Sequence, residues 1–309
     1  MTPTRARATR DLRGGVLVVD KPPGPTSHDI VHVVRLALGH PRIGHTGTLD
    51  PFATGVLGLV VGRATRLAQF FADADKEYTA RIRLGTATDT YDATGSVTFA
   101  APGGTPWPDA VALRTALAGF EGTRDQMPPP FSAKKSGGIP AYERARQGHA
   151  VELRPARVTA HALELRAADG ADLEVRVHCS AGFYVRSLAH DLGSALGLGG
   201  HLVGLRRTRS GTFTEAEAVG LELVLLDPDD AIARLVPLEA LLTEWPGLVL
   251  DEEGAHRVRH GLPVGRSHIR AWPGGDLPQR ARLLGPDGLL LAVADRQPGG
   301  VLHPGLVLG

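Results

Sequence analysis

The sequence contains a single cysteine, Cys179, in 309 residues. One cysteine excludes an internal disulfide framework and any zinc site built from several cysteines. Cys179 lies in an alternating apolar run, which predicts that it is buried as a small hydrophobic side chain. Aromatic residues are also few, at 5%, so any exposed aromatic side chain is a candidate ligand contact.

Long apolar runs are missing as well. The apolar stretch Val16–Val19 follows an arginine-containing N-terminus, but it is too short for a signal peptide or a membrane span. We therefore expect a cytoplasmic protein without membrane contact.

No charge of one sign dominates, because the formal net charge is only +1. Bulk charge therefore does not indicate a nucleic-acid partner, and the distribution of charge matters more. Two short basic clusters stand out, at 206–209 and at Lys134 and Lys135. Taken alone, such clusters are typical of a solvated surface.

Cofactor and metal motifs are absent from the sequence. There is no dinucleotide-binding glycine pattern in the glycine-rich loop, no phosphate loop, no HExxH and no GxSxG. His256 and His260 are spaced i, i+4, but no acidic ligand arrangement lies nearby, so they indicate one face of a helix. The sequence therefore predicts neither a bound metal nor a nucleotide cofactor.

Helix and strand patterns are mixed along the chain without strict βαβ alternation, which favours an α+β sheet protein. Thr26 or Ser27 is expected to cap a helix that Gly39 ends. Alternate residues from Tyr78 to Leu84 form one face of a strand. Residues 121–140 are rich in Pro, Gly, Ser and Lys and predict a mobile functional loop rather than a core element.

The sequence pattern changes after about residue 245, where predicted short strands alternate with Pro-Gly and Asp-Gly turns. We place a domain boundary there.

The loop GHTGTLDPFATG, residues 44–55, carries the most informative chemistry. Its glycines allow sharp turns and the close approach of a ligand, and Pro51 keeps Asp50 extended. Asp-Pro in a loop is most often simple turn chemistry. This loop is long, however, and it offers a carboxylate, an imidazole and hydroxyl groups together.

The sequence around this loop and beyond it resembles a known family. The segments GGVLVVDKPPGPTSHDIV, RIGHTGTLDPFATGVLGLVVGRATRLAQF and KEYTARIRLGTATDTYDATG look like the stand-alone bacterial TruB-type tRNA pseudouridine-55 synthases. The resemblance continues through QMPPPFSAKKSGGIPAYERARQG, CSAGFYVRSLAHDLG and HLVGLRRTRSG, and it covers residues 15 to about 215. The tail from about 247 is similar, more weakly, to the PUA-type RNA-binding domain of such enzymes.

The resemblance implies a pseudouridine-synthase fold, with a large mixed, mainly antiparallel sheet flanked by helices. It implies a catalytic domain at 1–245 with an RNA-gripping loop at 124–150, and a β-rich PUA-like domain at 246–309. The implied activity is isomerisation of uridine 55 in the T stem-loop of transfer RNA. No cofactor and no protein partner are implied, and we expect a monomer.

The same resemblance assigns roles to residues at the reacting base. Asp50 is the catalytic carboxylate, which either attacks ribose C1′ or assists proton removal to a glycal-like intermediate. Arg186 pairs with Asp50 and is expected to lower its pKa. Tyr78 lies on the face of the uracil, where its hydroxyl is a plausible base for the C5 proton.

Further residues match positions that bind or support the substrate. Tyr184 and Leu205 match nucleotide contacts, although a leucine in a strand is usually just packed. Lys21, with Pro22, supports the site from outside its chemistry. Since the target base must be flipped out of a folded loop, His45 is expected to fill the vacated stack.

Basic side chains of the 124–150 loop are expected to contact phosphates. They are Lys134, Lys135, Arg144 and Arg146. The chain departs from the family pattern at Thr48, and at Tyr91 between Asp89 and Asp92, without an evident loss of function.

Three other interpretations compete. A guide-RNA-dependent relative shares the catalytic core, but the 124–150 insertion is typical of stand-alone enzymes. A non-catalytic RNA-binding protein would suit the tail and the basic clusters and would leave the set of Asp50, Tyr78 and Arg186 unexplained. An unrelated glycosidase would need a second carboxylate, for which Asp89 or Asp92 could be proposed.

Overall fold

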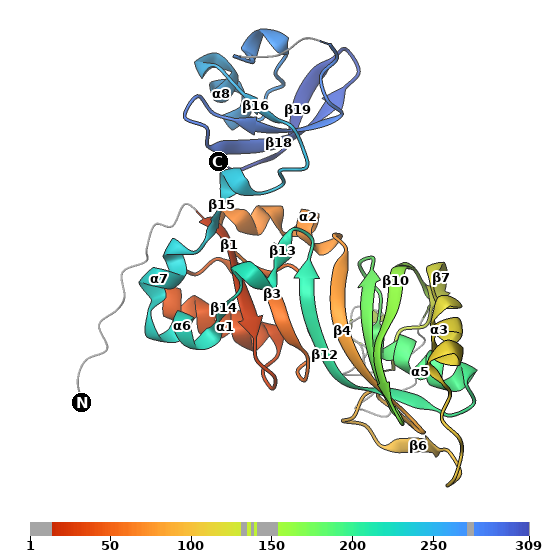
Figure 1. Cartoon of the computed structure of the whole chain (residues 1–309). Helices are drawn as coiled ribbons and strands as arrows, with labels where there is room; N and C mark the ends of the chain where they lie inside the picture. Colours follow the sequence, from red (N-terminus) through yellow and green to blue (C-terminus); the bar gives the residue numbers. More distant parts are fainter. Residues whose placement is uncertain (1–13, 131–134, 137–138, 141–153, 271–274, 309) are drawn as a thin grey trace, which may run out of the picture.

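The computed structural model describes residues 14–130, 135–136, 139–140, 154–270 and 275–308. It contains one large sheet flanked by helices and, above it in Figure 1, a small four-stranded sheet. The architecture is the expected α+β fold. The predicted burial of Cys179 is also confirmed, with 1% of the residue exposed.

The large sheet has the strand order β14-β1-β3-β12-β4-β11-β10-β7, with β2, β13 and β15 paired at its margins. Most neighbouring pairs are antiparallel, and the parallel pairs are β1 with β14 and β3 with β12. The strands on the main path are β1 (Gly14–Lys21), β3 (Thr54–Gly62), β4 (Lys76–Leu84), β7 (Gly122–Gln126), β10 (Ala156–Asp169), β11 (Asp172–Cys179), β12 (Gly200–Ser210) and β14 (Val219–Gly220).

The marginal and separate strands are short. They are β2 (Ile43–His45), β5 (Thr86–Thr88), β6 (Val97–Ala100), β8 (Lys135–Ser136), β9 (Ile139–Pro140), β13 (Phe213–Thr214) and β15 (Val236–Pro237). Strands β5 and β6 form a hairpin, and β8 pairs with β9.

The main core lies between one face of the large sheet and its helices. These are α1 (Ser27–Leu38), α3 (Ala110–Ala118), α5 (Val185–Ala195), α6 (Leu221–Leu226) and α7 (Pro228–Ala233). The caps of α1 agree with the sequence prediction. Thr26 forms a capping box with Asp29, and Gly39 ends the helix at φ 62°.

The short helices lie outside this core layer. They are η1 (Arg63–Leu67), α2 (Ala68–Ala72), η2 (Glu215–Glu217), η3 (Leu238–Ala240) and η4 (Arg266–His268).

The small sheet has the order β16-β17-β18-β19, with α8 (Glu252–Arg259) packed on it around a core of its own. Its strands are β16 (Gly247–Val249), β17 (Arg280–Leu284), β18 (Leu290–Gln297) and β19 (Val301–Val307). A second apolar cluster joins this unit to the rest of the chain, since Leu290, Val293 and Leu308 pack in it together with Val16 and Val18.

Two sequence expectations need correction. Residues 122–126 form β7 and pair with β10 at the edge of the large sheet, so this part of 121–140 is not a loop. A short strand, β2, pairs with β3 and begins the loop of Asp50, where no strand was expected. Both strands are too short to show a clear alternation, and β7 also takes its partner, β10, from a distant segment, so local periodicity could not indicate them.

No helix in the described part of the chain is both long enough and apolar enough to span a membrane.

Candidate active site

The loop of Asp50 occupies the space between the end of β2 and the start of β3. A turn closes within it, because the backbone N–H of Ala53 donates to the carbonyl of Asp50 at 3.0 Å. Gly55 then has φ 99°, and a Cβ there would lie 2.2 Å from the carbonyl oxygen of Arg207. Only glycine therefore lets β3 approach β12 at this point.

Two buried polar side chains hold this loop from the N-terminal segment. The Nζ of Lys21, which is 0% exposed, donates to the carbonyls of Pro51 at 3.0 Å and Ala53 at 2.8 Å. The Oγ of Ser27 accepts a hydrogen bond from the N–H of Leu49 at 2.9 Å. Asp50 thus lies between two anchored backbone segments. The sequence pattern around Ser27 indicates only a possible cap of α1 and gives no sign of its role in the site.

Arg207 also binds backbone carbonyls of this loop and of the start of β3. Its guanidinium donates to the carbonyls of Val56 at 2.7 Å, Gly47 at 3.2 Å and Thr48 at 3.4 Å. Only 1% of Arg207 is exposed. The expectation of a solvated surface for the basic run 206–209 is therefore wrong for Arg207, because backbone carbonyls compensate the buried guanidinium.

The carboxylate of Asp50 forms a two-pronged ion pair with Arg186. The Nη2 of Arg186 donates to Oδ1 at 3.0 Å, and its Nε lies 2.9 Å from Oδ2. The third nitrogen, Nη1, lies 3.2 Å from Oδ2 of Asp92. Side-chain exposure is 31% for Asp50 but only 7% for Arg186 and 5% for Asp92. Asp50 is therefore the accessible member of a buried carboxylate–guanidinium–carboxylate row.

The carboxylate of Asp92 is hydrogen-bonded to neighbouring groups of the protein. Its Oδ1 accepts from the hydroxyl of Thr90 at 2.8 Å and from the N–H and hydroxyl of Thr94 at 2.9 and 2.6 Å. From the sequence alone, Asp92 was a candidate only for the second carboxylate of a glycosidase. The structure gives it a supporting position behind Arg186.

Burial raises the pKa of Asp50 above its ordinary value, and the neighbouring Asp92 adds to the increase, while Arg186 and Lys21 oppose it. Arg186 lowers the pKa of Asp50, as expected. The effect of burial is larger, so the pKa of Asp50 is raised overall. The pKa of Lys21 is lowered to about 8, chiefly by burial.

Tyr78 lies buried on β4, opposite Val177 of β11 on one side and Arg207 of β12 on the other. Burial raises its pKa, and Asp50 also raises it, whereas Arg207 lowers it. Tyr78 belongs to the same apolar cluster as Leu49 and Ala53 of the Asp50 loop. The hydroxyl is held in its protonated form.

Two further predicted residues lie on β12 and at the start of α5. Leu205 lies on β12 opposite Ala80 and packs against the main core. Tyr184 is the N-cap residue of α5, and Gln126 holds its backbone through both amide atoms, at 2.8 and 3.0 Å. Gln126 was missed because it belongs to β7, which the sequence analysis did not recognise as a strand.

His45 ends β2, and its ring contacts the ring of His28 edge to face, with 5.1 Å between centroids. Burial lowers the pKa of His45, and His28 and Arg207 lower it further. A neutral imidazole results, and its Nδ1 has no hydrogen-bond partner among the residues that the structure describes.

Asp50, Arg186, Tyr78 and Lys21 are therefore brought together from four distant segments. Among the residues that the structure describes, Asp50 does not belong to a group of three or more potential metal ligands. The predicted phosphate contacts Lys134, Arg144 and Arg146 lie outside the described residues, as does the side chain of Lys135.

Comparison with known proteins covers nearly the whole chain. Residues 35–185 match the TruB family pseudouridylate synthase N-terminal domain, and residues 186–243 match the tRNA pseudouridylate synthase B C-terminal domain. The "tRNA pseudouridine synthase B" of Syntrophotalea carbinolica is 41% identical, over 89% of this chain and 90% of its own. That of Aromatoleum aromaticum is 47% identical, over 79% of each chain.

Solved structures agree on the fold. A chain of the archaeal box H/ACA sRNP Nop10-Cbf5 complex matches with a TM-score of 0.70 and 26% identity, over 96% of this chain and 86% of its own. A second match, to an H/ACA RNP bound to a substrate RNA containing 2′-deoxyuridine, has a TM-score of 0.72 and 26% identity.

Proposed function

The chain belongs to the TruB family and is a tRNA pseudouridine synthase, an isomerase, and from this premise we propose that it converts uridine 55 in the T stem-loop of transfer RNA with Asp50 as its nucleophile. The observation that carries the assignment of Asp50 is its ion pair with Arg186, at 2.9 and 3.0 Å. This ion pair leaves the Asp50 carboxylate accessible, while Arg186 and Asp92 behind it are buried.

The isomerisation requires one carboxylate rather than two. The bond from C1′ to N1 breaks and a bond from C1′ to C5 forms, while C5 loses a proton and N1 gains one. No water is consumed, so the second carboxylate that a glycoside hydrolase needs has no task here. Asp50 either attacks C1′ or assists proton removal to a glycal-like intermediate.

The surroundings of Asp92 favour this reaction over glycoside hydrolysis. A general acid or base must reach the substrate within hydrogen-bond distance. Asp92 is 5% exposed, and Arg186, Thr90 and Thr94 occupy its oxygens. It therefore serves to orient Arg186, which in turn holds Asp50.

We assign recognition of the flipped base to four side chains that the resemblance to the family indicates. Tyr78 provides a ring face and a hydroxyl for the uracil, Leu205 an apolar contact, and Tyr184 a contact at the start of α5. A neutral His45 suits insertion into a base stack, because an uncharged imidazole is less costly to desolvate than an imidazolium.

Transfer RNA is favoured over a guide-RNA-directed substrate by the degree of similarity. The two bacterial relatives described above, both named tRNA pseudouridine synthase B, are 41% and 47% identical to this chain, whereas the chains from H/ACA particles are 26% identical. We propose that the chain acts as a monomer without a protein partner. We further propose a catalytic domain at 1–245 and an RNA-binding, PUA-like domain at 246–309.

The test is tritium release. The protein is incubated with unmodified transfer RNA labelled at uracil C5, in buffer with EDTA and without added cofactor. Release of label from position 55, mapped on the product RNA, supports the proposal. Release from another uridine would overturn the assignment to uridine 55, and no release from any site would overturn the proposed reaction.

A further inference from the structure

Three metal-ligating side chains lie together on the face of the large sheet opposite Tyr78. They are Asp75, in the turn before β4, His161 on β10 and His178 on β11. His178 pairs across the strands with Glu77, while Val177 pairs with Tyr78. Since neighbouring strand residues point to opposite faces, His178 and Tyr78 lie on different sides of the sheet. The group is therefore separate from the active site.

A β-bulge brings His161 to this face. Ala160 pairs with Cys179 and Leu163 with Val177, so two residues of β10, His161 and Ala162, oppose the single residue His178. The extra residue changes the alternation of β10 and directs both side chains to the side of His178. Bulges often redirect a side chain toward a functional position.

The distances fit one shared ion. The Nε2 of His161 lies 3.3 Å from Oδ2 of Asp75, and the Nε2 of His178 lies 3.8 Å from the same oxygen. All three ligand atoms lie within 4.8 Å of one another. Two atoms bound tetrahedrally at about 2.1 Å from a zinc ion lie about 3.4 Å apart. Small side-chain rotations would complete the geometry.

His178 provides a second observation. Its Nε2 is inaccessible to solvent and has no hydrogen-bond partner among the described residues, although it points toward Asp75. Asp75 is itself held in place, because the N–H of Gly211 donates to its carbonyl at 2.8 Å. Glu77 also faces His178 across the strands, but Arg176 and Arg209 lie close to its carboxylate, at 2.6 and 3.8 Å, whereas Asp75 is the carboxylate within 4.0 Å of both imidazoles.

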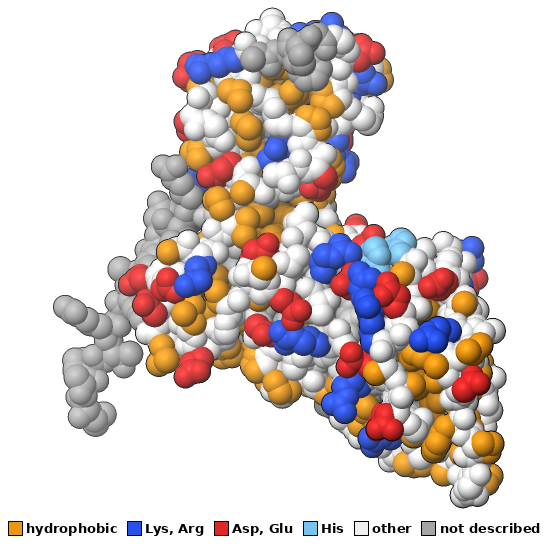
Figure 2. Space-filling view, in the orientation of Figure 1, with side chains coloured by type: hydrophobic (Ala, Val, Ile, Leu, Met, Phe, Trp, Pro, Cys, Tyr) orange, Lys and Arg blue, Asp and Glu red, His pale blue; other side chains and the backbone are white. Residues whose placement is uncertain are grey.

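We propose that Asp75, His161 and His178 form a binding site for a divalent cation of the zinc class, with a fourth position open to water. Two imidazoles and one carboxylate suit zinc, cobalt or nickel better than magnesium or calcium, which prefer oxygen ligands. In Figure 2 histidine side chains gather at one point of the visible face, beside basic and acidic groups. The bound ion would tie the turn before β4 to β10 and β11.

The test uses the full-length, tag-free protein after treatment with EDTA. Zinc binding is measured by calorimetry, and cobalt binding by visible absorption, which reports a tetrahedral site. We expect one ion per chain, and His161→Ala and His178→Ala should each weaken binding by more than about tenfold, since even indirect ligand supports are worth about 10–100-fold. Zinc should raise the Tm of the wild type and not that of these variants.

His256→Ala is the matched control, because His256 and His260 also form a close histidine pair, with ring centroids 4.4 Å apart near the end of α8. Binding that persists in His178→Ala and disappears in His256→Ala would overturn the proposal, as would the absence of binding to the wild type. If an alanine variant fails to fold, Asp75→Asn keeps the side-chain shape and must still lose affinity.

Discussion

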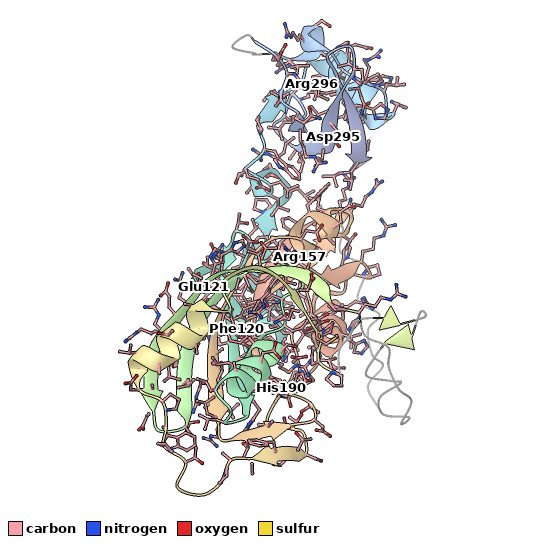
Figure 3. All side chains as sticks on the ribbon, turned by 90° about the vertical axis from the view of Figure 1, so that its right-hand side faces the viewer. Phe120, Glu121, Arg157, His190, Asp295 and Arg296 are labelled. Carbon is pink, nitrogen blue, oxygen red and sulfur yellow. The ribbon has the colours of Figure 1, made fainter. Side chains whose placement is uncertain are left out.

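Tyr91 stacks on His190, with ring centroids 3.8 Å apart and the planes 12° from parallel. His190 lies one helical turn after Arg186 on α5, and Tyr91 directly precedes Asp92, which binds Arg186. The loop from Thr88 to Thr94 therefore touches α5 at two points, once by stacking and once by charge. Figure 3 shows His190 on α5, between the large sheet and the β5–β6 hairpin.

Replacing Tyr91 should loosen the support of Arg186. An aromatic pair contributes about 0.5–1.5 kcal/mol beyond burial, so Tyr91→Ala should slow the single-turnover rate about twofold to tenfold, whereas Tyr91→Phe should keep it. Tyr91 has φ 63°, an uncommon conformation for a side chain of this size. Tyr91→Gly removes that strain together with the stack. If Tyr91→Gly is as fast as the wild type, the stack does not contribute to positioning.

Asp50→Asn should bind transfer RNA nearly as the wild type does and lose turnover by several orders of magnitude, because the amide cannot act as a nucleophile. Asp89→Asn is the matched control, since the Asp89 side chain accepts a hydrogen bond from the backbone of Ser96 rather than facing Arg186. Because the pKa of Asp50 is raised, the wild-type rate should begin to fall on acidification at a higher pH than the ordinary pKa of an aspartate would give. Activity of Asp50→Asn within tenfold of wild type would contradict the mechanism.

Tyr78→Phe keeps the ring and removes the hydroxyl. If the hydroxyl takes the C5 proton, kcat should fall by about 10²–10⁴-fold with little change in KM. Because the pKa of Tyr78 is raised, the hydroxyl starts protonated. It can accept the C5 proton only by passing its own proton on, and the proton that N1 of the uracil gains balances this transfer. A single-turnover assay across substrate concentrations separates the two parameters. Equal losses in rate and affinity would show that Tyr78 mainly positions the uracil.

Lys21 should affect stability in a defined pH window. Its pKa is about 8 in the folded protein and 10.5 ordinarily, so between these values the unfolded chain binds more protons. The contribution of Lys21 to the free energy of unfolding should therefore rise with pH from about 8 to 10.5. Lys21→Met lacks this dependence. The difference in Tm between wild type and Lys21→Met should grow in favour of the wild type across the window, and a constant difference would contradict the assignment.

Deleting residues 248–309 tests the division of labour between the domains. Contacts remote from the reacting base should raise affinity without changing the chemical step. The truncated protein should show a higher KM on full-length transfer RNA, a shallower salt dependence and an unchanged saturating single-turnover rate. Its Tm should also fall, because Val16 and Val18 lose Leu290 and Val293 as packing partners.

A short stem-loop that cannot reach the tail is the control substrate for this deletion, and both proteins should process it similarly. A collapse of the saturating rate in a truncated protein that remains folded would show that the tail belongs to the catalytic apparatus.

Local features could be predicted from the sequence because their causes are local. The capping box of Thr26, the left-handed Gly39 and the alternating buried residues from Tyr78 to Leu84 depend on neighbours a few positions away. The motif around Asp50 was identified in the same way, by the order and spacing of residues along the chain. These features were sufficient to indicate the family and the α+β fold.

Only the tertiary structure decided what surrounds these residues. Arg207 belongs to a basic run that suggests a solvated surface, yet it is buried because carbonyls from three loop and strand positions compensate its charge. Asp92 became a support for Arg186, and His161 joined His178 through a bulge in the pairing of β10 with β11. Burial and partner choice depend on which distant segments meet, and the chain order alone does not contain that information.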